Sequence, residues 1–190
     1  MGENGGRNLY AFILNNPNDS LDLFGLISAE FAWIFIKHYF TGDGIYLGVI
    51  DNDGEIKNSP EYQDYIELLK AKNKKEYQEI IREMVVGERR TAKVVLLDSN
   101  LELSDFWSLL TIHGSEGPLE FDGDLKIYKD QPCTAEMHFE GSVIWRDHSN
   151  MHPDIALDAL FRLLQKFGKG VEYPYSIHWD DEFTFIGFSF

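Results

Sequence analysis

In the first half of the chain, short apolar runs of strand length are separated by a longer segment in which the apolar residues have helical spacing. The segments 8–15 and 45–50 are short apolar runs, typical of buried strands. Between them, residues 20–39 are apolar on nearly all sides, which predicts a central helix with Ser20 as its N-cap. The DNDG stretch at 51–54 predicts a tight hairpin turn rather than a calcium loop, because carboxylates are missing at the first and last ligand positions.

Two helices with solvated faces are expected next. Ser59 and Pro60 have the residue types of an N-cap and a first helical position. The second helix follows directly and carries apolar residues at helical spacing, Ile80 and Met84 among them. Beyond it, the pattern predicts a strand over Thr91–Ser99 and then a short helix capped at Ser104.

Period-two alternation is the main signal of the second half. Residues 118–128 contain Asp122-Gly123 between alternating apolar positions, which predicts a β-hairpin with its turn there. The following strand has one apolar face that includes Met137 and Trp145, and Gly141 suggests a bulge in it.

A helix over 153–167 and an apolar strand or hairpin complete the chain. The apolar positions of the last segment change parity between Phe185 and Ile186, which predicts a bulge near Gly187 or burial on both faces.

This order of elements favours an α+β fold. We expect a mixed, mainly antiparallel sheet packed against several helices, with a C-terminal β-β-β-α-β unit. The length of 190 residues favours one compact domain spanning 1–190, with a sub-domain seam at 114–118 as the best alternative boundary.

The charge is strongly negative and unevenly distributed. The formal net charge is −15, and the acidic excess lies in residues 1–56 and 100–190, whereas 57–99 are close to neutral. Such a field repels nucleic acid and attracts basic partners. The sequence therefore excludes direct nucleic-acid binding and predicts a basic protein partner.

The remaining composition indicates a cytoplasmic protein. A single cysteine, Cys133, allows no internal disulfide bond, and no apolar run is long enough to cross a membrane. We therefore expect no membrane association.

Catalytic signatures are missing from the sequence. It contains no nucleophile elbow, no phosphate-binding glycine loop and no paired cysteines. These absences favour a protein that is not an enzyme and needs no cofactor.

One cluster keeps an enzymatic alternative open. His148, His152 and Asp154 lie within seven residues, and His138 or His178 could supply a further ligand for a metal-dependent hydrolase. Pro153 weakens this alternative, because the residue before a proline avoids the helical conformation that would stack the two histidines.

The preferred hypothesis places a partner-binding surface in the last third of the chain. There, aromatic rings that could anchor a partner alternate with carboxylates that could steer it. Burial of the same rings at the start of a strand is the alternative interpretation. The candidate residues are Glu172, Tyr173, Tyr175, Trp179, Asp180, Asp181 and Glu182. Small acidic inhibitors of basic enzymes share this composition, including immunity proteins and phage anti-defence proteins. The sequence thus predicts an inhibitor that occludes the basic surface of a partner such as a nuclease. A third hypothesis is a subunit of a larger assembly, in which the apolar C-terminus pairs with a partner strand.

Overall fold

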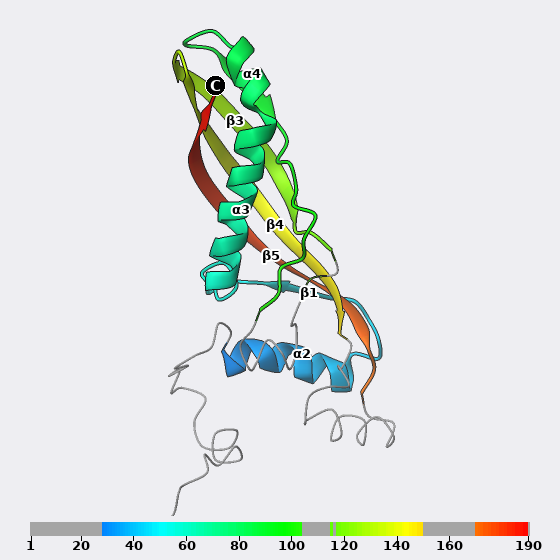
Figure 1. Ribbon diagram of the computed structural model, residues 1–190. Helices are drawn as coiled ribbons and strands as arrows, with labels where there is room; N and C mark the ends of the chain where they lie inside the picture. Colours follow the sequence, from blue (N-terminus) through cyan, green and yellow to red (C-terminus); the bar gives the residue numbers. More distant parts are fainter. Residues whose placement is uncertain (1–27, 104–114, 116, 150–169, 190) are drawn as a thin grey trace, which may run out of the picture.

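The computed structural model describes residues 28–103, 115, 117–149 and 170–189. Within them, five strands form a mixed sheet in the order β1-β5-β4-β3-β2, which confirms the predicted α+β class. The helices are α2 (Ala29–Thr41), α3 (Pro60–Glu76) and α4 (Gln78–Glu83), and the strands are β1 (Leu47–Ile50), β2 (Arg89–Ala92), β3 (Glu120–Gln131), β4 (Thr134–Ser149) and β5 (Tyr173–Phe188). Helices α3 and α4 lie over one face of the sheet, and α2 crosses one end of it (Figure 1).

Three predicted elements lie outside the described residues. They are the strand at 8–15, the helix capped at Ser104 and the helix over 153–167.

Helices α3 and α4 form in the region where the sequence predicts two successive helices. The Ser59 hydroxyl accepts a hydrogen bond from the Tyr62 N–H at 3.1 Å, and Pro60 opens α3. Tyr62, Ile66 and Leu69 then recur at helical spacing and are buried against the sheet. The core therefore lies between this helix and the inner sheet face.

Helix α2 differs from the prediction in its start and its burial. Ser28 is extended and caps the helix by accepting a hydrogen bond from Phe31 N–H, so α2 begins at Ala29, and the cap predicted at Ser20 lies outside the described residues. Phe35 is buried, but Trp33 is 57% exposed. The helix covers the end of the sheet with one face only, so the prediction of a central helix was wrong.

The predicted hairpin after β1 is replaced by a loop built on a carboxylate. Asp51 is buried, and its two oxygens accept hydrogen bonds from the backbone N–H groups of Glu55, Ile56 and Lys57 at 2.8–3.0 Å. These bonds fold the chain back toward α3, and residues 55–57 form turns instead of a strand.

The strand expected at Thr91–Ser99 ends early. β2 stops at Ala92, because the next residues are held by helix α3 instead of by the sheet. The Asn73 side chain donates to the Val95 carbonyl and accepts from the Val95 N–H, both at 2.9 Å. The buried side-chain amide of Asn73 thus satisfies the backbone groups of Val95 that a neighbouring strand would otherwise bind.

Asp122-Gly123 does not form a turn. β3 runs straight through it, and the chain reverses after Gln131 instead. Gly123 lies directly opposite Gly141 on β4, and a Cβ at Gly123 would lie 2.6 Å from the Glu140 carbonyl oxygen. The missing side chains let the two strands and the Phe139 ring pack closely, which overrides the local turn preference.

The long strands β4 and β5 pair without a bulge. The predicted apolar face of β4 is confirmed, since Met137 and Trp145 are fully buried. Gly141 and Gly187 both keep the register, so the bulges predicted there are absent. β5 is a single strand. Its apolar residues change from odd to even positions because Phe185 is buried in the core, whereas Ile186 lies on the outward face and is 41% exposed.

The glycine pair gives a direct test of this packing. We expect Gly123→Ala to lower the free energy of unfolding by about 1–3 kcal/mol, because its Cβ would meet backbone atoms. Gly48→Ala on β1 is the matched control, since its nearest neighbour would lie at 3.7 Å. Urea denaturation measures both, and equal effects would contradict the close-packing explanation.

Candidate functional site

The outward face of β3, β4 and β5 carries most of the candidate chemistry. Alternation places the even-numbered residues of these strands on the side of the sheet away from α3. The even positions between Glu120 and Tyr128, Glu136 and His148, and Ser176 and Ile186 hold seven carboxylates, three histidines, one lysine (Lys126) and one arginine (Arg146). We call this surface the acidic face. Its carboxylates belong to Glu120, Asp122, Asp124, Glu136, Glu140, Asp180 and Glu182.

Three carboxylates form one cross-strand row at the centre of the acidic face. Asp124 pairs with Glu140, and Glu140 pairs with Glu182 on the next strand. Like charges directly opposite each other destabilise a sheet. Two lysines offset this only partly, because Lys126 contacts Glu140 at 3.1 Å and Lys93 contacts Asp124 at 3.0 Å from exposed positions. We call these three residues the acid row.

A hollow of about 440 Å³ lies beside the acid row. The neighbouring cross-strand row, Asp122–Ser142–Asp180, forms part of its wall. Asp180 accepts a hydrogen bond from the Ser142 hydroxyl at 2.8 Å and stays exposed. Lys57 is the one basic residue that lines the hollow. The depression therefore presents several carboxylates to a cationic group.

Asp181 has a different role from its two neighbours. It points inward, where Tyr62 donates its hydroxyl hydrogen to it at 2.5 Å and Lys57 contacts it at 3.1 Å. Burial, followed by the Asp181 charge, raises the pKa of Tyr62 well above its usual range. This cluster joins α3 to β5 and keeps the strand fixed under the helix.

The structure separates the seven predicted partner-binding residues into two groups. Tyr173, Tyr175 and Trp179 are at most 4% exposed, so their rings belong to the core and are not surface anchors. Asp181 is also buried. Glu172, Asp180 and Glu182 are exposed, but only the last two lie on the acidic face.

Sequence reasoning missed the carboxylates that β3 and β4 contribute. Asp124 and Glu140 lie on the wet faces of strands whose alternation was visible in the sequence. What was hidden was the strand order, which places β4 between β3 and β5.

The metal-site alternative gains no support from the described residues. His148 lies near the end of β4, while His152 and Asp154 are outside the described part. His138 pairs with Thr184 and His178 pairs with Ile144 in the strand register, so the two histidines are six residues apart along the strands. The described residues contain no group of three or more ligands placed to hold a metal ion.

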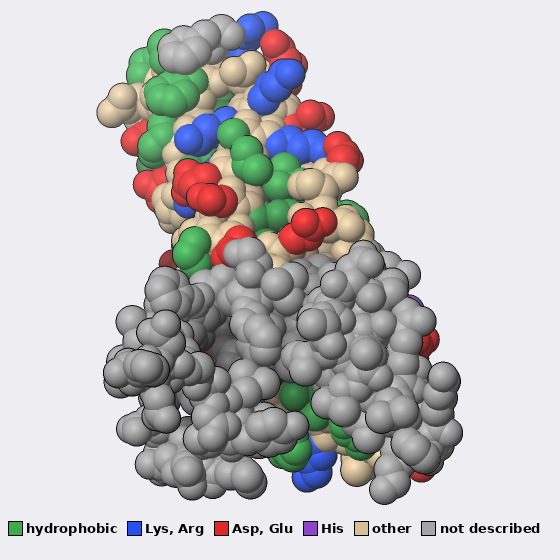
Figure 2. All heavy atoms as spheres, turned by 60° about the horizontal axis from the view of Figure 1, so that its bottom comes forward, with side chains coloured by type: hydrophobic (Ala, Val, Ile, Leu, Met, Phe, Trp, Pro, Cys, Tyr) green, Lys and Arg blue, Asp and Glu red, His purple; other side chains and the backbone are tan. Residues whose placement is uncertain are grey.

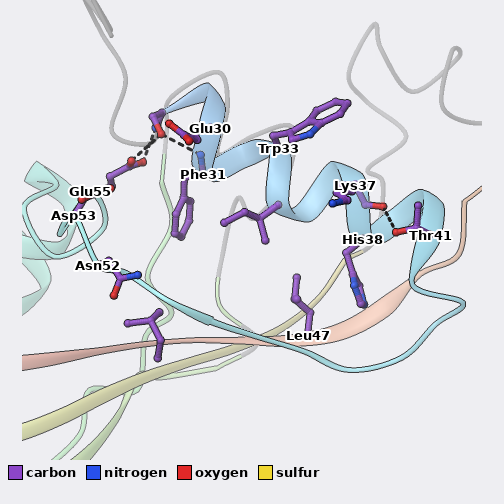
Figure 3. A pocket seen from close by; sticks show the side chains of 13 residues that line it. Glu30, Phe31, Trp33, Lys37, His38, Thr41, Leu47, Asn52, Asp53 and Glu55 are labelled. Carbon is purple, nitrogen blue, oxygen red and sulfur yellow. Dashed lines mark hydrogen bonds between the residues drawn. The ribbon is translucent and has the colours of Figure 1, made fainter. Parts of the chain in front are cut away.

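A second hollow, of about 590 Å³, lies between α2 and β1 (Figure 3). Some of its polar groups are already hydrogen-bonded. Glu55 accepts a hydrogen bond from the Ser28 hydroxyl at 2.7 Å, and His38 bonds to the Ile45 carbonyl. Burial, the largest effect, raises the pKa of Glu55. Trp33 lines the hollow at its exposed rim, so we regard this hollow as a seam between α2 and the loop after β1.

The surface around α3 and α4 is electrostatically mixed. Lys and Arg side chains are interspersed with Asp and Glu side chains on the described part of this side (Figure 2). Lys70 bonds to Glu67, and Arg82 bonds to Glu79, as i,i+3 pairs. The negative potential is therefore concentrated on the opposite side of the sheet.

Comparison with known proteins gives only a distant structural likeness. No family model and no curated protein matches the sequence. The crystal structure of Pectocin M2 is similar at 14% identity with a TM-score of 0.40. That match covers 84% of this chain and 54% of the other, so this chain spans about half its length. Among the described helices, none has the length and apolarity needed to cross a membrane.

The structural role of Asp181 can be tested against its exposed neighbour. We expect Asp181→Ala to lower the free energy of unfolding by about 1–3 kcal/mol, because the buried Tyr62 hydroxyl loses its acceptor. Glu182→Ala should change it by less than about 0.5 kcal/mol. A double-mutant cycle with Tyr62→Phe measures the coupling, and additive effects would show that the two side chains do not interact.

Proposed function

We propose that this protein is an acidic binding protein that occludes a basic surface of a partner protein through its acidic face. The acid row carries this proposal. A sheet that holds Asp124, Glu140 and Glu182 directly opposite one another loses stability, and a cationic partner would recover it.

The placement of charge supports a binding role. The acids lie on a regular sheet whose strands are roughly 5 Å apart, so their backbone positions are fixed before a partner arrives. Charges that are already positioned give specificity and fast association without ordering a loop.

The partner class follows from the same chemistry. A partner with clustered Lys and Arg side chains would match the acidic face, and proteins that contact nucleic-acid phosphates carry such clusters. We therefore infer that the partner handles nucleic acid, as a nuclease does. Occupying its cationic surface would block its substrate.

Removing the acid row tests this function. The probe is an oligolysine peptide of about eight residues, which supplies clustered positive charge. We expect the triple variant Asp124→Asn, Glu140→Gln, Glu182→Gln to bind it at least about tenfold more weakly, because three opposing charges are lost. Wild-type affinity should fall as salt rises from about 20 to 300 mM, since screening shortens the reach of the charges. Calorimetric titration measures both.

A matched variant on the helix side controls for net charge. Asp64→Asn, Glu76→Gln, Glu83→Gln removes the same residue types from exposed positions on α3 and α4. It should retain affinity within about threefold, because those acids do not lie in the acid row. Equal losses in the two triple variants would show that only overall charge matters. Binding that is insensitive to salt would contradict the proposal.

A further inference from the structure

The sheet leaves part of one edge open. β1 pairs with β5 only from Tyr175 to His178, and the Asp51 N–H extends this pairing by donating to the His178 carbonyl. Lys57 then donates to the Asp180 carbonyl at 2.7 Å. Between Glu182 and Gly187, no strand among the described residues pairs with this side of β5, which forms the outer border of the sheet (Figure 1).

The backbone along this stretch points polar groups outward. The carbonyls of His178 and Asp180 both accept bonds from the outer side, and a strand residue directs its N–H and C=O to the same side. The unbroken register with β4 continues this alternation to the end of β5. Thr184 and Ile186 therefore direct their backbone groups at the open edge, whereas the Glu182 N–H already donates to the Asp181 carboxylate at 2.9 Å.

The two edges of the sheet are protected differently. The opposite edge, β2, has only four residues and begins with Arg89 and Arg90. Short, charged strands resist further pairing. The stretch from Glu182 to Phe188 has no proline and no bulge, and Glu182 is its single charged residue. This edge therefore has the properties of a strand that accepts a partner.

The two sides of the open edge specify different side chains on an added strand. On the face of the sheet away from α3, the edge continues the acidic face through Asp180 and Glu182. On the face covered by α3, Phe183 and Phe185 extend the core. The Lys70 Nζ lies 5.8 Å from the Phe183 ring centroid, and the Lys74 Nζ lies 5.8 Å from that of Phe185. An added strand would continue both faces of the sheet, with basic residues on the acidic face and apolar residues on the face covered by α3.

We propose that the open edge of β5 binds an extended segment of alternating basic and apolar residues by strand addition. This inference rests on the proposed function, because the segment belongs to the same basic partner. Main-chain hydrogen bonds would provide affinity, and the two faces would provide specificity. A second copy of the chain is a poorer occupant, since each copy carries a net charge of −15.

The experiment uses the full chain and a defined peptide. The probe has about nine residues, with lysine and valine alternating, which matches an ordinary strand length. Its control is the same peptide with N-methyl groups on alternate residues, which keeps the charge and removes the hydrogen bonds. We expect the unmodified peptide to bind at least about tenfold more tightly, because the bonds form only with it.

A substitution on the protein tests the same bonds from the other side. Thr184→Pro removes an outward N–H without removing a bond to β4, a position where a strand tolerates proline. Thr184→Val is the matched control, because both variants lose the hydroxyl that contacts His138. We expect Thr184→Pro to lower affinity at least about tenfold relative to Thr184→Val.

Hydrogen exchange keeps the proposal testable if Thr184→Pro does not fold. In the wild-type chain, the amides of Thr184 and Ile186 should exchange quickly alone and slowly with the unmodified peptide. Unchanged exchange, or equal affinity for both peptides, would overturn strand addition while leaving the oligolysine result in place. Dimerisation of the free chain that Thr184→Pro abolishes would instead assign the edge to a second copy.

Discussion

The register between β4 and β5 is the constraint on which this structure depends. All sixteen residues of β4 pair with β5 without a shift. Because successive side chains alternate faces, a slip of one residue would bury Glu140 and Glu182 and expose Phe139 and Phe183. The core and the acidic face are thus two consequences of one pairing, and neither can change without the other.

The glycine pair shows how that register is kept where local preference opposes it. Asp122-Gly123 is a sequence typical of a turn, yet β3 passes through it unbroken. Gly123 and Gly141 lie opposite each other, and the Phe139 ring fills the space that their side chains would occupy. Tight packing of aromatic residues therefore outweighs the preference of two residues, as tertiary contacts commonly do in sheets.

The proposed function and the open edge follow from the same asymmetry. Helices α3 and α4 cover one face of the sheet (Figure 1) and carry charges of both signs. On the other face, the described strand residues include seven carboxylates but only one lysine and one arginine. β5 contributes Glu182 to that acidic face, and beyond its pairing with β1 no described strand lies beside it on its outer edge. A basic extended segment could meet both features at once, because the carboxylates and the outward backbone groups belong to one strand.

The sequence by itself determined the α+β class, the N-cap of α3 at Ser59 and the two faces of β4, because capping and period-two alternation are local. It also indicated the acidity and placed Asp180 and Glu182 among the candidate partner-binding residues. Only the tertiary structure decided the strand order, which brings Asp124 and Glu140 beside Glu182, and the burial of Trp179. Alternation along a strand shows that a residue has a face, but the face that becomes core depends on the elements that pack against it.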